Sequence, residues 1–135
     1  MLTITIGELE LVARLEEERS PQTVAAFRRL LPLESQLIQA RWSGQAAWIP
    51  FGDLDLRLGF EDPTSYPSPG ELLIYPGGAS ETEILFPYGQ TCFASKAGQL
   101  AGNHFATVVG GNEQLEEIGR RVLWEGAQPI RFVER

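Results

Sequence analysis

Short apolar runs that alternate with polar residues, separated by glycine and proline turns, dominate this chain and favour a mainly β fold. The alternation is clearest in residues 3–6 and 9–15, which meet at Gly7 and predict an opening hairpin. The same pattern predicts six further strands, at residues 37–42, 46–49, 72–75, 82–86, 105–109 and 130–133. Eight short strands are typical of an antiparallel barrel, in which the sheet closes on itself and leaves no free edge.

Two other segments have a helical spacing of apolar residues. The first follows Ser20, a residue type that favours the N-cap position, and begins at Pro21, where a missing N–H costs nothing. The second follows Asn112, another predicted N-cap. Their apolar stripes are Val24, Phe27, Leu30 and Leu31 in the first helix, and Leu115, Ile118 and Val122 in the second. We therefore expect two helices that plug the open ends of a closed eight-stranded barrel.

Length and charge limit the organisation and the partners of the chain. With 135 residues, 43% of them hydrophobic, residues 1–135 are expected to form one domain. The net charge of −7 would repel a phosphate backbone, so no nucleic-acid partner is expected. No apolar run approaches the roughly 18 residues of a membrane span, and no membrane partner is expected. A homodimer is only the base-rate expectation.

The redox and targeting signals are few. Cys92 is the only cysteine, which excludes an internal disulfide and favours a reducing cytoplasm. The first residues lack the basic start and the apolar core of a signal peptide. Glu81 and Glu83 with His104 could hold a metal ion, but acids on a strand edge are more often solvated, so no metal and no cofactor are expected.

Two motifs far apart in the chain resemble the cyclophilins. Arg14-Leu15 leads into Pro-x-Thr-x-x-x-Phe-x-x-Leu over residues 21–30, and Leu-x-Gly-x-His stands at residues 100–104. The resemblance covers nearly the whole chain, and it implies an eight-stranded antiparallel barrel capped by two helices. The chain is more similar still to bacterial cyclophilin-like proteins catalogued as a domain of unknown function, through Gly70-Glu71, Tyr75-Pro76-Gly77 and Ile84-Leu85-Phe86.

The cyclophilin resemblance also implies candidate site residues. His104 takes the place of the histidine that fixes the substrate backbone, and Leu100 that of a leucine in the proline pocket. Gln99 stands where the pocket aromatic would be. The position of the catalytic arginine falls on Ala40, so Arg41 is one residue out of phase and would need a β-bulge to face the same way.

From these residues the leading hypothesis is a barrel that binds a small molecule or a short peptide in a groove on its wall. His104, Leu100 and Arg41 would border the groove, with Gln99, Tyr75, Tyr88 and Glu83 near it. One alternative is a peptidyl-prolyl isomerase, which requires Arg41 and His104 to face one groove. A second is a small-molecule hydrolase or lyase that pairs His104 with Glu83 or Cys92 as acid and base. Whether the protein is an enzyme stays open at this point.

The sequence also predicts whether four aromatic residues and the single cysteine are buried or exposed. Trp42 and Trp48 are expected to fill the barrel, because alternate strand positions of a small barrel must be filled. Tyr75 and Tyr88, each next to a turn, are expected to be partly exposed. Cys92 is expected to be a small buried apolar residue rather than a nucleophile.

Overall fold

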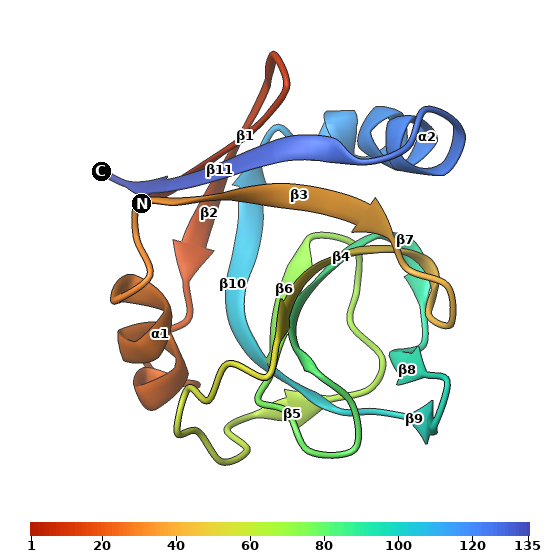
Figure 1. The fold of residues 1–135 in the computed structure, drawn as a ribbon. Helices are drawn as coiled ribbons and strands as arrows, with labels where there is room; N and C mark the ends of the chain where they lie inside the picture. The colour runs from red at the N-terminus through yellow and green to blue at the C-terminus, as the bar shows by residue number, and fades with distance from the viewer.

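Strands make up most of the chain in the computed structural model, which describes residues 1–135 (Figure 1). Two α-helices are present, α1 (Pro21–Arg28) and α2 (Leu115–Trp124), and a short 3-10 helix, η1 (Asn112–Gln114), leads into α2. Neither α-helix has the length and apolar character that crossing a membrane requires. The strands are β1 (Leu2–Ile6), β2 (Leu9–Leu15), β3 (Leu33–Gln39), β4 (Gly44–Gly52), β5 (Pro63–Thr64), β6 (Glu71–Tyr75), β7 (Thr82–Thr91), β8 (Ala94–Ser95), β9 (Gly98–Gln99), β10 (Gly102–Gly110) and β11 (Gln128–Glu134).

Eight of these strands close into an antiparallel barrel, which confirms the predicted architecture. They follow one another around the barrel in the order β2-β1-β11-β3-β4-β7-β6-β10, and β10 returns to pair with β2. The other three strands lie outside this ring: β5 pairs with β10, and β8 and β9 form a small hairpin of their own. These three have two residues each, too few for a periodic signal, and none of them was among the predicted strands.

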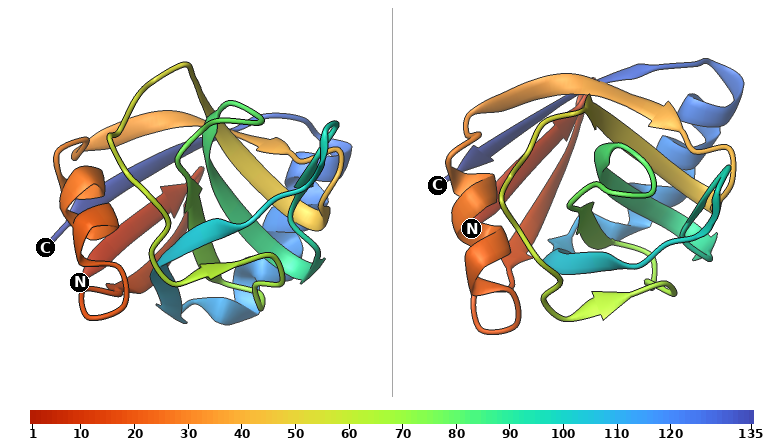
Figure 2. Two further views of the ribbon diagram at one scale, coloured as in Figure 1. Left: turned by 90° about the horizontal axis from the view of Figure 1, so that it is seen from below. Right: turned by 60° about the horizontal axis from the view of Figure 1, so that its bottom comes forward.

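The barrel interior is filled by aliphatic residues and phenylalanines, with both helices contributing to one continuous core. Phe27 of α1 packs against Phe105 and Phe132, with ring centroids 4.8 and 5.5 Å apart. The views in Figure 2 show α1 beside the chain termini and α2 across the barrel from it. The helix residues that join this core are Val24 and Phe27 from α1 and Leu115, Ile118 and Val122 from α2.

The expectations about tryptophan and tyrosine were wrong for three residues. Trp42 is 55% exposed, because β3 ends at Gln39 and leaves this residue in a turn rather than in a strand. Trp48 is half-buried on the outer face of β4, since the interior positions beside it are taken by Ala47 and Ile49. Tyr75, predicted to be partly exposed, is only 4% exposed.

The start of α1 is capped by a residue from a distant loop. Ser20 lies at the predicted N-cap position, but its hydroxyl donates to the carbonyl of His104 instead of accepting a helix N–H. The Glu61 carboxylate accepts from the backbone N–H groups of Gln22 (3.2 Å) and Thr23 (2.7 Å) in its place. Burial would raise the pKa of Glu61, but the hydrogen bond from the Thr23 hydroxyl, at 2.7 Å, and those from the two backbone N–H groups outweigh it and lower the pKa.

Replacing Glu61→Ala should lower the free energy of unfolding by about 1 kcal/mol, the usual cost of removing a helix N-cap. Urea denaturation at pH 7 measures this, with Glu10→Ala on an exposed strand position as the matched control. Because the folded-state pKa of Glu61 lies below its unfolded value, this stabilisation is present above the unfolded pKa and is lost as the pH falls through the folded one. An equal effect of both variants at pH 7 would contradict the cap.

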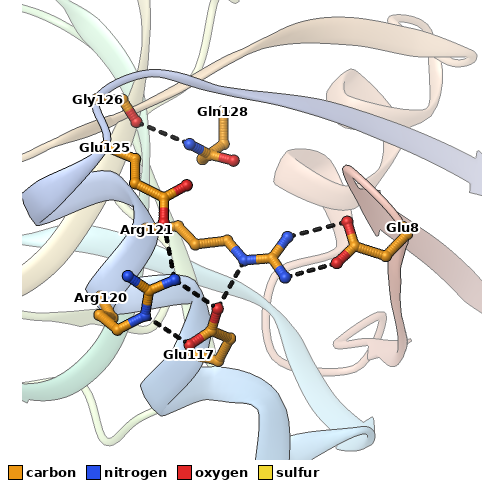
Figure 3. A network of polar contacts seen from close by, with 7 residues as sticks. All are labelled: Glu8, Glu117, Arg120, Arg121, Glu125, Gly126 and Gln128. Atoms are coloured by element: carbon orange, nitrogen blue, oxygen red, sulfur yellow. Dashed lines mark hydrogen bonds and ion pairs between the residues drawn. The ribbon is translucent and has the colours of Figure 1, made fainter.

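Ion pairs fasten α2 to the turn between β1 and β2 (Figure 3). Arg121 donates to both carboxylate oxygens of Glu8, at 2.9 and 2.5 Å, and to Glu117 one helical turn earlier at 2.8 Å. Arg120 donates to Glu117 and to Glu125, so both arginines are paired with acids. The pair of Arg121 with Glu8 joins groups 113 positions apart in the sequence, whereas the other pairs lie within and just after α2.

The predicted N-cap of the second helix is displaced. Asn112 opens the 3-10 turn η1 instead of α2, and its side-chain amide donates to the carbonyl of Val108 at 3.1 Å. The amide therefore fastens the start of this helical segment to the end of β10. Leu115, Ile118 and Val122 are buried as their spacing predicted.

Candidate functional site

Four neighbouring strands carry one row of side chains across the outside of the barrel. Trp48 of β4 pairs with Leu85 of β7, which pairs with Leu73 of β6, which in turn pairs with His104 of β10. Adjacent strands lie about 4.8 Å apart, so the backbones of Trp48 and His104 are separated by roughly 14 Å. Trp48 and His104 therefore lie at opposite ends of one outer wall, in different surroundings.

A second apolar cluster fills the middle of this wall. The segment that contains the β8–β9 hairpin folds over the outside of the sheet and places Phe93 and Leu100 against it. Phe93 meets the Tyr75 ring edge-on, with centroids 5.9 Å apart, and this packing explains why Tyr75 is buried. Gly102 lies against Leu73 of this cluster, since a Cβ atom at this position would come within 2.9 Å of the Leu73 side chain. The cluster thus separates His104 from the surface near Trp48.

On the Trp48 side of this cluster the wall is hollowed into a groove of about 420 Å³. It lies between the β3–β4 turn, the β6–β7 turn and the β8–β9 hairpin, and we call it the wall groove. Its charged and aromatic lining residues are Arg41, Trp42, Trp48, Glu81, Glu83 and Lys96, and Ile38, Leu85 and Ala94 are among its apolar ones.

Ser43 fixes the shape of one rim. Its hydroxyl donates to the Ala94 carbonyl and accepts from the Ala94 N–H, both at 3.1 Å, while its own carbonyl accepts from Cys92. These bonds tie the β3–β4 turn to the segment before the β8–β9 hairpin. Arg41 and Trp42 are therefore held beside the groove by a turn whose backbone is fastened on two sides.

Glu83 is the unusual member of the wall groove. Its side chain lies on the outer face of β7, opposite Tyr75 and Pro50, and only 7% of the residue is exposed. The carboxyl group makes no hydrogen bond and no ion pair within the protein, although Arg41 and Lys96 line the same groove. Burial raises the pKa of Glu83 to about 8, and the nearby charge of Glu81 adds to the shift. At neutral pH Glu83 is therefore mostly protonated.

The raised pKa has a consequence for stability. A carboxyl group that is protonated more readily in the folded state stabilises it at low pH, and this contribution is lost as the pH rises from the unfolded value toward about 8. We expect Glu83→Gln, which keeps the neutral shape, to become more stable than the wild type across this range. Urea denaturation between pH 5 and pH 9 measures the difference, and parallel curves for the two proteins would contradict a buried neutral Glu83.

His104 is part of a hydrogen-bonded chain at the other end of the row. Its Nε2 lies 2.7 Å from the Thr107 hydroxyl, which donates to Glu16 at 2.6 Å, and Arg14 also donates to Glu16. Burial would raise the pKa of Glu16, but the hydrogen bonds from Thr107 and Arg14 outweigh it and lower the pKa. Because the Thr107 hydrogen points to Glu16, the hydroxyl accepts from His104, which requires the Nε2–H tautomer.

Thr107→Val should break this chain and leave His104 and Glu16 without their shared partner. We expect a loss of about 1–3 kcal/mol in the free energy of unfolding, the usual cost of a buried unpaired polar group. Imidazole nitrogen chemical shifts should show the Nε2–H tautomer in the wild type and a mixture in the variant. A wild-type His104 in the Nδ1–H form would contradict the arrangement.

The structure brings together only some of the predicted site residues. Arg41 and Glu83 line the wall groove, whereas His104 is 6% exposed and bonded to Thr107. Leu100 is 7% exposed within the outer cluster. Arg41 lies in the turn between β3 and β4, outside both strands, so the irregularities of β4 at Gly44–Ala46 and Pro50–Gly52 do not turn it toward His104. Arg41 and His104 thus do not face one groove.

The remaining predicted residues lie outside the wall groove. Tyr88 is half-buried beside Gly119 of α2, and its hydroxyl donates to Gln39 at 2.6 Å. Gln99 is exposed in β9, and its amide donates to the Tyr66 hydroxyl. The Tyr75 hydroxyl accepts from the Ala79 N–H and braces the β6–β7 turn.

Lys96 was missed as a lining residue, because only folding of the β8–β9 hairpin brings it to the groove. Trp42 and Trp48 were expected to fill the interior, and the structure places both at the groove. The signal that could have found them is the pair Trp42 and Trp48 on either side of a glycine turn.

Cys92 and the acids do not assemble a reactive centre with His104. Cys92 is exposed, contrary to the expectation of a buried apolar residue. Neither it nor Glu83 is a hydrogen-bond partner of His104. No group of three or more histidine, cysteine, aspartate and glutamate side chains is arranged to hold a metal ion.

Sequence comparison assigns the chain to a family. Residues 2–134 match the model described as Protein of unknown function (DUF3830). The chain belongs to this family. The comparison with curated proteins returned no match.

Solved structures share the fold of this DUF3830 protein at low sequence identity. A structure of McbB in complex with tryptophan matches it with a TM-score of 0.67 and 18% identity. That match covers 100% of this chain but only 45% of the McbB chain. A hypothetical protein from Archaeoglobus fulgidus, solved in solution, matches with a TM-score of 0.57 and 19% identity over 99% of this chain and 93% of its own. The resemblance to the cyclophilins stays a prediction.

Proposed function

We propose that this protein binds a small molecule or a short peptide in the wall groove. The observation that carries the proposal is Glu83, a residue 7% exposed that lines the groove and whose carboxyl group has no hydrogen-bond partner within the protein. No fully buried side-chain oxygen or nitrogen lacks a partner, so the Glu83 carboxyl oxygens are open to the groove and not sealed in the core. A ligand in the groove would supply the missing partner.

The two tryptophans support the same site. Trp42 is 55% exposed and Trp48 half-buried, and both line the groove beside Glu83. Large flat side chains bury much apolar area at a low cost in side-chain entropy, which is why they are frequent in binding sites. The bound tryptophan of McbB makes this amino acid a reasonable first probe for a protein of the same fold.

The two enzymatic alternatives receive less support. A peptidyl-prolyl isomerase of the cyclophilin kind needs Arg41 and His104 in one groove, and Phe93 and Leu100 lie between them. A hydrolase or lyase with His104 and Glu83 as acid and base needs the two groups within hydrogen-bond reach, or one water apart. His104 is bonded to Thr107, and β6 lies between the strands of His104 and Glu83.

The three tryptophan indole N–H signals make a direct NMR test. We expect a titration with tryptophan and with short X-Pro peptides to shift the signals of Trp42 and Trp48 and to leave that of Trp124 unchanged. Trp124 is 77% exposed on α2, outside the wall groove, so it serves as an internal control. Trp48→Ala should weaken binding by at least about tenfold, because it removes a large buried contact.

Either of two outcomes would contradict this proposal. Equal shifts at all three tryptophans would indicate nonspecific binding, and no shift at Trp42 and Trp48 with any probe would show an unused groove. Exchange cross-peaks between cis and trans peptide in the same tubes would instead establish isomerase activity.

A further inference from the structure

Glu83 stands in a groove that offers it no positive charge at hydrogen-bond distance. The charged groups of the wall groove come from three turns: Arg41 before β4, Glu81 before β7, and Lys96 between β8 and β9. Burial raises the pKa of Glu83, and Glu81, as a like charge, opposes the negative form further. On the neighbouring strand, the Tyr75 hydroxyl is engaged with Ala79. The protein itself therefore provides no counter-ion for the Glu83 carboxylate.

A bound cation would supply the counter-ion that the protein does not provide for the Glu83 carboxylate. Two acids at one end of a groove make a strongly negative site once both are ionised, and a buried carboxylate pairs best with a charged hydrogen-bond donor. Beyond Glu81, the acids Asp53 and Asp55 line an adjoining hollow and add to the negative surroundings. This end of the groove thus favours a positive group on the ligand.

The apolar wall of the groove determines what the positive group is attached to. Trp42 and Trp48 offer indole faces, which attract cations and also cover flat apolar bodies. Ile38 and Leu85 continue this wall. A metal ion would find no third ligand here, since no cluster of three suitable side chains exists. An organic amine satisfies both the carboxyl group and the apolar wall.

We propose that the wall groove selects ligands that carry an ammonium group on a flat apolar body, with the ammonium against Glu83 and the body against Trp42 and Trp48. This inference rests on the proposed function, because it names the chemistry that the groove selects. When the cation binds, Glu83 gives up its proton to the buffer and forms an ion pair with the ammonium group, which keeps its own proton.

Three indole compounds that differ in one group test the selection. Tryptamine carries an ammonium, tryptophol a neutral hydroxyl in its place, and indole-3-propionate a carboxylate. We expect tryptamine to bind at least roughly tenfold more tightly than tryptophol, the usual contribution of a hydrogen bond to a charged group. Indole-3-propionate should bind no better than tryptophol. Glu83→Gln should remove the preference for tryptamine, and Glu10→Gln, outside the groove, should leave it unchanged.

Proton release is a second readout that needs no variant. Glu83 is mostly protonated at pH 7 because burial raises its pKa to about 8, so tryptamine should release most of one proton per molecule bound. At pH 9, above this pKa, the release should fall to a small fraction of a proton. Calorimetry in buffers with different ionisation enthalpies measures this number, and tryptophol should release none.

The outcomes separate this inference from the proposed function. If none of the three compounds shifts Trp42 and Trp48, and tryptophan and the peptides also fail, the groove is not a binding site and both proposals are wrong. If compounds bind there but tryptophol equals tryptamine, or no proton is released at pH 7, only the ammonium selection is wrong. Tighter binding of indole-3-propionate would likewise overturn it, because Arg41 and Lys96 would then select an anion.

Discussion

The pairing of β2 with β10 closes the barrel, and the rest of the structure depends on it. Closure gives every barrel strand two neighbours and divides the side chains into an inner and an outer set. The closing strand β10 carries two bulges, one of which lies between His104 and Ala106. That bulge puts both His104 and Thr107 on the outer face, and the closing strand brings Glu16 to them. The hydrogen-bonded chain of His104 is therefore a product of closure.

The outer wall carries a second layer, and this layer decides the site. Phe93 and Leu100 cover the middle of the wall, bury Tyr75 and separate His104 from the groove. Ala94, Ser95 and Lys96 of the same segment line one side of the groove. The folding of the segment around β8 and β9 over the sheet thus both covers the middle of the wall and forms one rim of the groove. The site that stays open on this wall is the wall groove, which is lined by charged and aromatic side chains.

Long-range polar contacts hold the helices in place. Glu61 caps α1 from the loop between β4 and β5, two strands later in the chain, and Glu8 anchors α2 through Arg121. In each case a charged group approaches a helix from a segment far away in the sequence. These contacts fix where the helices meet the barrel, while the apolar stripes fix which faces they bury.

The sequence by itself determined the barrel, because period-two alternation and the helical stripes are local signals of which face each residue presents. It also placed Arg41 and Glu83 near a groove. The sequence did not determine that Trp48 faces outward, since residues 46–49 are all apolar and do not alternate with polar residues. Nor could it separate His104 from Arg41, because Phe93 and Leu100 come between them only after the β8–β9 segment folds over the wall. Such contacts join residues distant in sequence, and only the tertiary structure brings them together.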